Sequence, residues 1–334
     1  MRVFVLGAGA SVHAGYPLTK DLGPKLFDYV KGNGGPRNYP YWPDLDELAE
    51  YGSPSDIEEL VTSLEAHEKP GTKLAGLREA LCSYFDSIRP REAELYKRFA
   101  NAIVPPADTI ISFNYDLSLE LELKRAGTWE ASDGYGFDLG ICSLPKSSVK
   151  LLKLHGSTNW VDLLFEGARG FSQGNGDSLG PRPVFPWGLD HLGYPGIKDP
   201  RWRQGGVERA GSMVLPSRNK KYHVSTSINP REREGFWNLL WGQAADALRR
   251  ADEIIIIGYS LPAADSRARA LLLDRGNHDA PLTICCGSRS TDIGKEFVQA
   301  GFVRGKICFD FGRFEDWLAG GNVLRRHRSL VSAN

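Results

Sequence analysis

The stretch Val3-Phe4-Val5-Leu6-Gly7-Ala8-Gly9-Ala10-Ser11 decides the fold that we expect for this chain. Its first four residues are apolar, and three of them are β-branched or aromatic, which predicts a short buried strand. Gly7 and Gly9 lack a Cβ, so the chain can turn tightly there and its backbone can approach a ligand closely. A helix is expected next, with Pro24 in its first turn and its end near Val30. Together, the strand, the glycine-rich turn and the helix gather backbone N–H groups that can hold phosphates.

This turn alone does not define a dinucleotide site. The usual fingerprint has a third glycine where this chain has Val12, and an acidic residue that closes a second strand about 20 residues later. Asp21 and Asp28 are the nearest candidates, and neither ends a strand-like run. On this motif alone, a tight turn that binds no ligand remains the alternative.

Length and charge limit the classes of protein that fit. The chain has 334 residues, a length that suggests one large domain with insertions or two domains, and we expect a single domain over 1–334. Its formal net charge is +0. The short basic cluster at 325–328 is expected to be a solvated tail, so the sequence carries no direct nucleic-acid signature. No apolar run reaches the roughly 18 residues of a membrane span, and no signal-peptide pattern follows the first strand. We therefore expect a cytoplasmic protein without a membrane segment.

The cysteines predict neither a disulfide framework nor a metal site. The chain has five, an odd and scattered number, and no two of them form a C-x-x-C pair. Buried, reduced thiols are the expected state. The five are Cys82, Cys142, Cys285, Cys286 and Cys308.

Two insertions are expected between the strands. A helical insertion covers about 44–104, where Ser53 or Ser55 can cap the first of about three amphipathic helices. A loop-rich insertion covers about 158–211, where Gly, Pro and Trp are frequent and the periodicity is weak. The turn residues at 31–36 predict a loop before the helical insertion, and 213–216 is interpreted as a short edge strand.

The rest of the chain alternates between apolar strands and amphipathic helices. Strands are expected over 108–114, 149–156, 254–260, 282–286 and 306–311, and helices over 230–250, 263–274 and 292–300, with one more beginning at Leu117. Near-continuous apolar strands that alternate with helices predict a doubly wound, mostly parallel α/β sheet of the Rossmann-like kind.

Four of these strands end in glycine or polar residues. Their ends are Gly7-Ala8-Gly9, Asn114-Tyr115-Asp116, His155-Gly156-Ser157 and Gly258-Tyr259-Ser260. A lone histidine or asparagine in such a place is commonly a structural residue. Because ligands bind beyond the carboxyl ends of parallel strands, four such ends together predict a binding site.

The same strand ends carry a resemblance to a known family. In chain order, Gly7–Ser11, Phe113–Asp116, Lys153–Gly156 and Gly258–Ser260 resemble the four NAD-site motifs of the sirtuin superfamily. The resemblance extends from Val3 to about Leu273. It is greatest to the sirtuin-like domains of bacterial anti-phage defence systems, which hydrolyse NAD, and it includes 237–241 and 257–262. The resemblance implies a Rossmann-like sirtuin core that uses NAD as a substrate.

The sequence departs from the protein-deacylating sirtuins in three places. After Gly15 and Pro17 it lacks their Pro-Asp-Phe-Arg segment, and Phe113 stands where they have glutamine. They also carry a four-cysteine zinc module after the histidine, whereas this chain has no cysteine between Cys142 and Cys285. A zinc module of that kind is therefore not expected, and no metal site is predicted.

The resemblance implies a role for each candidate residue. Asn114 would fix a water or a ribose hydroxyl, and His155 would take a proton, which makes these two the catalytic candidates. Asp116 has two open interpretations, a bond to ribose or a cap for the following helix, and Asp265 is a weaker candidate because a carboxylate at a helix start is favoured by the dipole alone. The cofactor-binding candidates are Gly7, Ala8, Gly9, Ala10, Ser11, Asp116, Gly258, Tyr259, Ser260 and Asp265.

Three functions are compatible with these residues. The first is an NAD glycohydrolase that releases nicotinamide and ADP-ribose as a regulated defence effector. The second is an NAD-dependent lysine deacylase or ADP-ribosyltransferase, and the third is a non-catalytic sensor of NAD or ADP-ribose. Because the chain shows no sensing domain of its own, we expect any trigger to come from a partner protein or from homo-oligomer assembly.

Overall fold

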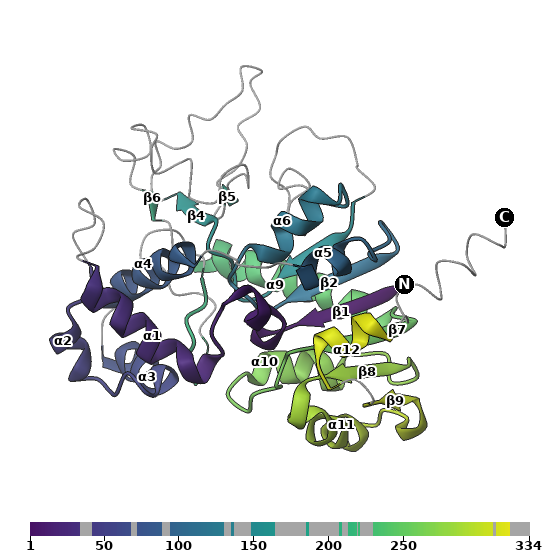
Figure 1. The fold of residues 1–334 in the computed structure, drawn as a ribbon. Helices are drawn as coiled ribbons and strands as arrows, with labels where there is room; N and C mark the ends of the chain where they lie inside the picture. Colours follow the sequence, from purple (N-terminus) through teal and green to yellow (C-terminus); the bar gives the residue numbers. More distant parts are fainter. Residues whose placement is uncertain are drawn as a thin grey trace.

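A six-stranded, all-parallel sheet forms the centre of the computed structural model (Figure 1). The residues described are 1–33, 42–67, 72–88, 94–129, 135–136, 148–163, 185–186, 207–208, 213–218, 220, 230–309 and 312–320. The strand order is β3-β2-β1-β7-β8-β9. The strands are β1 (Arg2–Leu6), β2 (Asp108–Ser112), β3 (Lys150–Lys153), β7 (Glu253–Ile257), β8 (Leu282–Cys285) and β9 (Ile307–Cys308). The prediction of a doubly wound parallel sheet is confirmed.

The strand order places a topological switch point beside β1. The six strands in chain order occupy the positions 3-2-1-4-5-6, which is the order of dinucleotide-binding folds. Val3 in β1 pairs with Thr109 in β2 on one side and with Ile254 in β7 on the other. Because helices cover both faces of the sheet, these central strands are apolar without alternation. The crevice at the carboxyl ends of β1 and β7 is where such a sheet binds its ligands.

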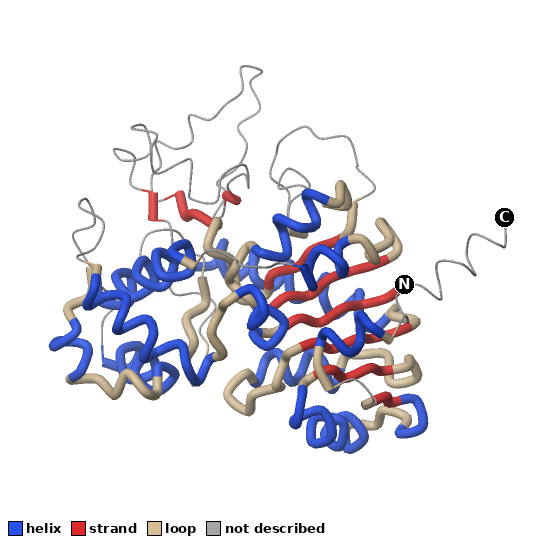
Figure 2. Tube along the Cα trace, viewed as in Figure 1, coloured by secondary structure: helices blue, strands red, loops and turns tan. Residues whose placement is uncertain are grey.

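Helices pack on both faces of the sheet (Figures 1 and 2). The ring of Phe4 meets the rings of Phe99 and Trp317 edge-on, with centroids 5.0 and 5.9 Å away. These two rings come from α5 (Glu94–Ala100) and α12 (Phe314–Ala319), helices that lie on the face toward the viewer beside α6 (Ser118–Arg125). The other helices of the sheet layers are α9 (Pro230–Arg249), α10 (Ser266–Arg269) with the π-helical turn Ala270–Asp274, and α11 (Ser290–Gln299).

A second hydrophobic core, which we call the helical cluster, lies beyond the carboxyl ends of the strands (Figure 1). Its buried residues run from Ala14 to Phe85 and include Met213 and Leu215. α5, which falls inside the expected insertion at 44–104, packs instead in the core of the sheet. The helices of the cluster are α1 (Thr19–Gly32), α2 (Leu45–Ala49), α3 (Ile57–His67) and α4 (Thr72–Ser87).

Three local predictions are wrong. The β1 strand is followed by a 3₁₀ helix, Ala8–Ala14, and α1 begins only at Thr19, so Pro24 lies in its second turn and not in its first. The prediction of a loop at 31–36 is wrong for its first two residues, because α1 continues through Gly32, and 34–36 lie outside the described residues. At α3, the cap is Asp56, whose Oδ1 accepts the Glu59 N–H at 2.9 Å, while Ser53 instead binds the Ser55 N–H.

The segment 213–216 is buried but forms no strand. The Val214 N–H donates to the His155 carbonyl at 3.0 Å, and the Val214 carbonyl accepts from the Tyr115 hydroxyl at 2.6 Å. These single bonds on either side do not make a ladder, so the predicted edge strand is a buried connection. Val214 packs into the core of the sheet, whereas Met213 and Leu215 pack into the helical cluster.

Parts of the predicted loop-rich insertion form a small sheet with the order β5-β4-β6. Its strands are β4 (Trp160–Leu163), β5 (Phe185–Pro186) and β6 (Val207–Glu208). The prediction of loops over 164–184, 187–206 and 209–211 falls on residues outside the described ranges. Among the helices in the described ranges, none has both the length and the apolar character to cross a bilayer.

Candidate functional site

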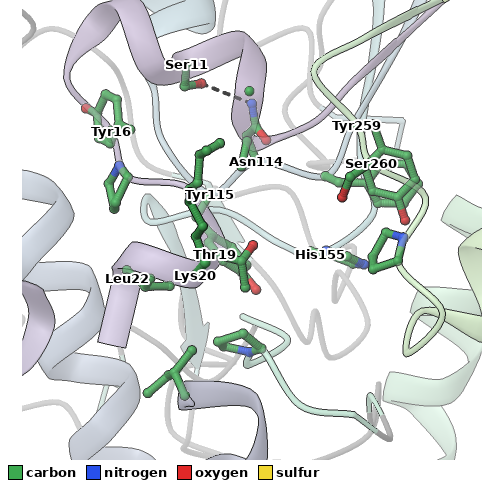
Figure 3. A pocket seen from close by; sticks show the side chains of 18 of the residues that line it. Ser11, Tyr16, Thr19, Lys20, Leu22, Asn114, Tyr115, His155, Tyr259 and Ser260 are labelled. Atoms are coloured by element: carbon green, nitrogen blue, oxygen red, sulfur yellow. Dashed lines mark hydrogen bonds between the residues drawn. The ribbon is translucent and has the colours of Figure 1, made fainter. Parts of the chain in front are cut away.

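A cavity of about 650 Å³ lies between the carboxyl ends of the strands and the helical cluster (Figure 3). Its size is within the range of about 300 to 1,000 Å³ that is typical of small-molecule sites. Of the site residues predicted from the sequence, all except Gly7 and Ala10 line it. The members of that lining set are Ala8, Gly9, Ser11, Asn114, Asp116, His155, Gly258, Tyr259, Ser260 and Asp265.

The two glycine turns touch each other backbone to backbone. A Cβ on Gly7 would lie 2.6 Å from the Tyr259 Cα, and a Cβ on Gly9 would lie 2.8 Å from the Gly258 Cα. Gly258 itself has a φ of +65°, and the Gly9 N–H donates to its carbonyl at 2.9 Å. The glycines are therefore needed to join the β1 and β7 ends. The Gly9 N–H is already bonded inside the protein.

The amide nitrogen of Asn114 is hydrogen-bonded to the protein, whereas its amide oxygen has no hydrogen-bond donor among the described residues. Its Nδ2 donates to the Gly7 carbonyl at 2.9 Å and to the Ser11 Oγ at 3.0 Å, the bond drawn in Figure 3. The Oδ1 atom is buried without a hydrogen-bond partner in that part of the chain. A buried acceptor of this kind on a cavity wall is suited to a hydroxyl group or a water molecule.

The Ser11 hydroxyl belongs to a network inside the protein. It is 1% exposed, donates to Asp116 Oδ2 at 2.7 Å and lies 2.8 Å from the Tyr96 hydroxyl. Asp116 Oδ1 accepts the Ser118 N–H at 3.0 Å in the first turn of α6. Both oxygens of Asp116 thus have protein partners, which favours the helix-cap interpretation over a bond to ribose.

A buried ion pair fixes the turn between β2 and α6. The Lys153 ammonium donates to Glu120 Oε1 and to the Asp116 carbonyl, both at 2.6 Å. The two side chains are 1% and 2% exposed. Burial raises the pKa of Glu120, and the charge of Lys153 opposes this effect. The pair therefore links the turn that follows Asn114 to the end of β3, where His155 lies two residues after Lys153.

His155 and Asp265 form a buried pair beyond the ends of β3 and β7. The His155 Nε2 lies 3.0 Å from the Asp265 Oδ2, and the side chains are 6% and 1% exposed. Burial lowers the pKa of His155, whereas the carboxylate of Asp265 and a hydrogen bond to the Phe113 backbone raise it, and the charge of Lys220 lowers it. His155 is therefore a buried imidazole with a carboxylate at one ring nitrogen.

Aromatic rings line the cavity on two sides. Phe113 stacks on Tyr259 with centroids 4.2 Å apart and an angle of 16° between the planes, and its centroid lies 4.9 Å from that of His155. Tyr16 and Phe85 stack at 5.4 Å on the side of the helical cluster. Figure 3 shows Tyr259, Ser260 and His155 together on one side of the view and Tyr16 on the other. Flat apolar faces of this kind suit a planar ring of a ligand.

Sequence reasoning missed the residues that enter from the helical cluster and from two later loops. Lys20, Asp56 and Glu58 line the cavity from α1 and the start of α3, and Lys220 and Arg289 line it elsewhere. Arg289 could have been found, because it follows β8 in the same way as the four strand ends that were identified. Lys220 follows a segment without periodicity, so no sequence signal indicates it.

The described residues offer little for a metal ion. They contain no group of three or more His, Cys, Asp or Glu side chains that could hold one. In the same part of the chain, Cys82 and Cys285 are buried free thiols, and Cys286 and Cys308 are partly buried. Burial raises the pKa of Cys286 to about 11, which keeps its thiol protonated at neutral pH.

No protein-family profile matches the sequence, and no curated protein matches it either. Solved structures of Sir2 proteins do align with it. A Sir2 homologue variant in complex with ADP-ribose aligns over 100% of this chain and 94% of its own, with 16% identity and a TM-score of 0.39. A Sir2 enzyme aligns over 98% and 93% with 14% identity and a TM-score of 0.42, and a Sir2 homologue–NAD complex over 90% and 88% with 16% identity and a TM-score of 0.35. Likeness at these TM-scores does not bear on function, which has to be inferred from the cavity.

Proposed function

We propose that this protein is an NAD glycohydrolase that cleaves the nicotinamide–ribose bond to give nicotinamide and ADP-ribose. The observation that carries the proposal is the Asn114 Oδ1 atom, which has no hydrogen-bond partner among the described residues, in a side chain that lines the same cavity as His155. The two residues follow the adjacent parallel strands β2 and β3. Their position, together with the sequence motifs that resemble the NAD-site motifs of sirtuins, supports a pair of roles at the same ribose. Asn114 would accept a hydrogen bond there, and His155 would act as the base.

The cavity fits such a substrate in three respects. Its volume of about 650 Å³ suits a ligand with two nucleoside halves. The Phe113–Tyr259 stack offers a face to a planar ring. Lys20 and Arg289 line the cavity as cations that can balance a diphosphate.

The protein groups have separate tasks in the proposed reaction. Glycosidic bonds break through an oxocarbenium-like transition state, in which positive charge develops on the sugar. Asn114 Oδ1 would accept a hydrogen bond from a ribose hydroxyl or from the attacking water and so fix its position. His155 would take the proton of that water, and its buried surroundings would exclude other nucleophiles. As a defence effector, the protein would be regulated through a partner protein or through self-assembly.

An assay of the full chain with NAD tests the proposal. We expect nicotinamide and ADP-ribose to appear in equal amounts when the products are separated by chromatography. His155→Ala should abolish most of this turnover, whereas Lys295→Gln, on the exposed face of α11, should not. If the protein binds NAD but does not cleave it, even with its partner protein added or after self-assembly, this result would contradict hydrolysis and favour the sensor. NAD-dependent loss of acetyl groups from lysine peptides would favour the deacylase.

A further inference from the structure

We propose that Asp265 is a positioning residue for His155, and not a ligand of the substrate as its place in the cavity wall suggests. The inference rests on the proposed function, in which His155 is the base. The partners of the two carboxylate oxygens of Asp265, which come from four different places in the chain, support it.

One oxygen of Asp265 is crowded with protein groups. Asp265 Oδ2 lies 3.0 Å from His155 Nε2, 3.2 Å from Lys220 Nζ and 3.1 Å from the hydroxyl of Tyr259, which donates to it. The Lys220 ammonium and the Tyr259 hydroxyl each donate a hydrogen bond to this oxygen, which occupies its two lone pairs, and the His155 ring lies beside it, so no place is left for a ribose hydroxyl. This oxygen therefore serves the protein and not a ligand.

The other oxygen of Asp265 has a structural task. Oδ1 accepts the Ala268 N–H at 3.2 Å and so caps α10. The cap fixes the carboxylate relative to the β7 end, and the side chain is 1% exposed. Asp265 therefore presents Oδ2 to His155 from a rigid helix start.

The surroundings of His155 give Asp265 an electrostatic role as well. Among the described residues, the Asp265 carboxylate lies 3.0 Å from the His155 ring, Lys220 and the Tyr259 hydroxyl bind that carboxylate, and the Tyr115 ring lies at a centroid distance of 6.4 Å from the His155 ring. Burial raises the pKa of Asp265, but the charges of His155 and Lys220 hold it below its usual value, so the carboxylate is ionised at neutral pH. An ionised carboxylate at a ring nitrogen orients the imidazole and stabilises the imidazolium that forms when the base takes a proton.

The test is a pair of substitutions with opposite effects on the His155 ring. Asp265→Asn keeps an oxygen that can cap α10 but removes the negative charge, so the pKa of His155 should fall. Lys220→Gln removes a cation that lowers the pKa of His155, so that pKa should rise. NMR titration of the histidine ring signals in the full chain measures both shifts, with the His155 signal identified from its loss in His155→Gln. Asp292→Asn and Lys295→Gln, which alter an exposed pair on α11, serve as matched controls and should move neither.

Turnover and stability provide the second readout. The acid limb of the pH profile of kcat/KM reports the base of the free enzyme, so it should move to lower pH in Asp265→Asn and to higher pH in Lys220→Gln. At its optimum, Asp265→Asn should lose up to about 10⁴-fold in kcat, the loss found when the carboxylate beside a general-base histidine is replaced by an amide. Thermal unfolding checks that the variant is folded.

The outcomes separate this inference from the proposed function. A His155 pKa that is unchanged in folded Asp265→Asn would overturn the role of Asp265, whether or not the wild type cleaves NAD. Opposite shifts of the ring pKa in the two variants would support it. Opposite shifts together with a wild type that never cleaves NAD would leave the pairing intact and refute the glycohydrolase.

Discussion

The two sides of the cavity are built in different ways. On the side of the sheet, Asn114 and His155 are buried, and the cation of the ion pair beneath them, Lys153, is 1% exposed. On the side of the helical cluster, Lys20 is exposed, and Asp56 pairs with Arg218 through side chains that are 48% and 51% exposed. A buried group holds its position before a ligand arrives, whereas a solvated charge remains adjustable. In the function proposed above, the buried sheet side would carry the chemistry and the solvated helical side would select the ligand.

The largest effect is expected from the strand ends of the sheet side. Asn114→Ala and His155→Ala should each remove most NAD cleavage, because a positioned base contributes about 10² to 10⁴ in rate. Since the two groups would act as a unit, the double variant should be little worse than either single variant. Turnover and NAD affinity are measured for all four proteins. Variants that still bind NAD but no longer cleave it would support the assignment of catalysis to the sheet side. Undiminished turnover in His155→Ala would contradict the role of the histidine.

The buried ion pair should give the next largest effect, on stability. Lys153→Met leaves Glu120 buried without its cation, and removal of one partner of such a pair costs about 3 to 5 kcal/mol. The double change Lys153→Met with Glu120→Leu should recover much of the lost free energy of unfolding, because no unpaired charge remains. Urea unfolding measures both. A single variant as stable as the wild type would show that the turn does not depend on this pair.

The contact between the glycine turns should give a smaller effect. A Cβ on Gly9 would lie 2.8 Å from the Gly258 Cα, so Gly9→Ala should lose about 1 to 3 kcal/mol of stability as well as NAD affinity. Gly242→Ala is the matched control, because a Cβ there meets no atom within 4 Å and lies within α9. This control should gain roughly 0.5 to 1 kcal/mol. Equal stability of the two variants would mean that the turns are not packed as described.

The smallest effect is expected on the helical side. Arg218→Ala removes exposed pairs with Asp56 and Glu59, at 2.7 and 2.6 Å, which are worth about 0 to 1 kcal/mol. Because salt screens exposed charges, the difference from the wild type should shrink as ionic strength rises. Thermal unfolding at two salt concentrations measures it. A loss as large as that of Lys153→Met would erase the distinction between the two sides.

The sheet side could be predicted from the sequence for a geometric reason. Parallel strands all end at one edge, so Asn114, His155 and the Gly258 turn are brought together by strand order alone. The strands themselves were recognisable because burial on both faces makes them continuously apolar. The 3₁₀ helix after β1 and the start of α1 at Thr19 could not be recognised from the sequence. Proline is typical of the first turn of a helix, so Pro24 suggested a later start than the one observed.

The helical side could not be predicted, because its residues reach the cavity through tertiary packing. Asp56 and Glu58 lie at the start of a helix, where acidic residues are favoured for local reasons. The same ambiguity concealed the partner of His155, since Asp265 also caps α10. A residue whose presence is explained by helix capping gives no sign in the sequence that it also contacts a distant residue. Only the distances in the folded chain show that contact.

The position of β1 in the middle of the sheet has a consequence for synthesis of the protein on the ribosome. β1 emerges long before its neighbour β7, as the contact between Met1 and Asp252 across 251 residues illustrates. At about 5 to 20 residues per second, translation of that interval takes roughly 13 to 50 s. During this time β1 can pair with β2 on one edge, but the edge that β7 will cover stays open, and a nascent chain must shield it, as by binding a chaperone. The crevice between the ends of β1 and β7 is thus completed only after β7 has been made.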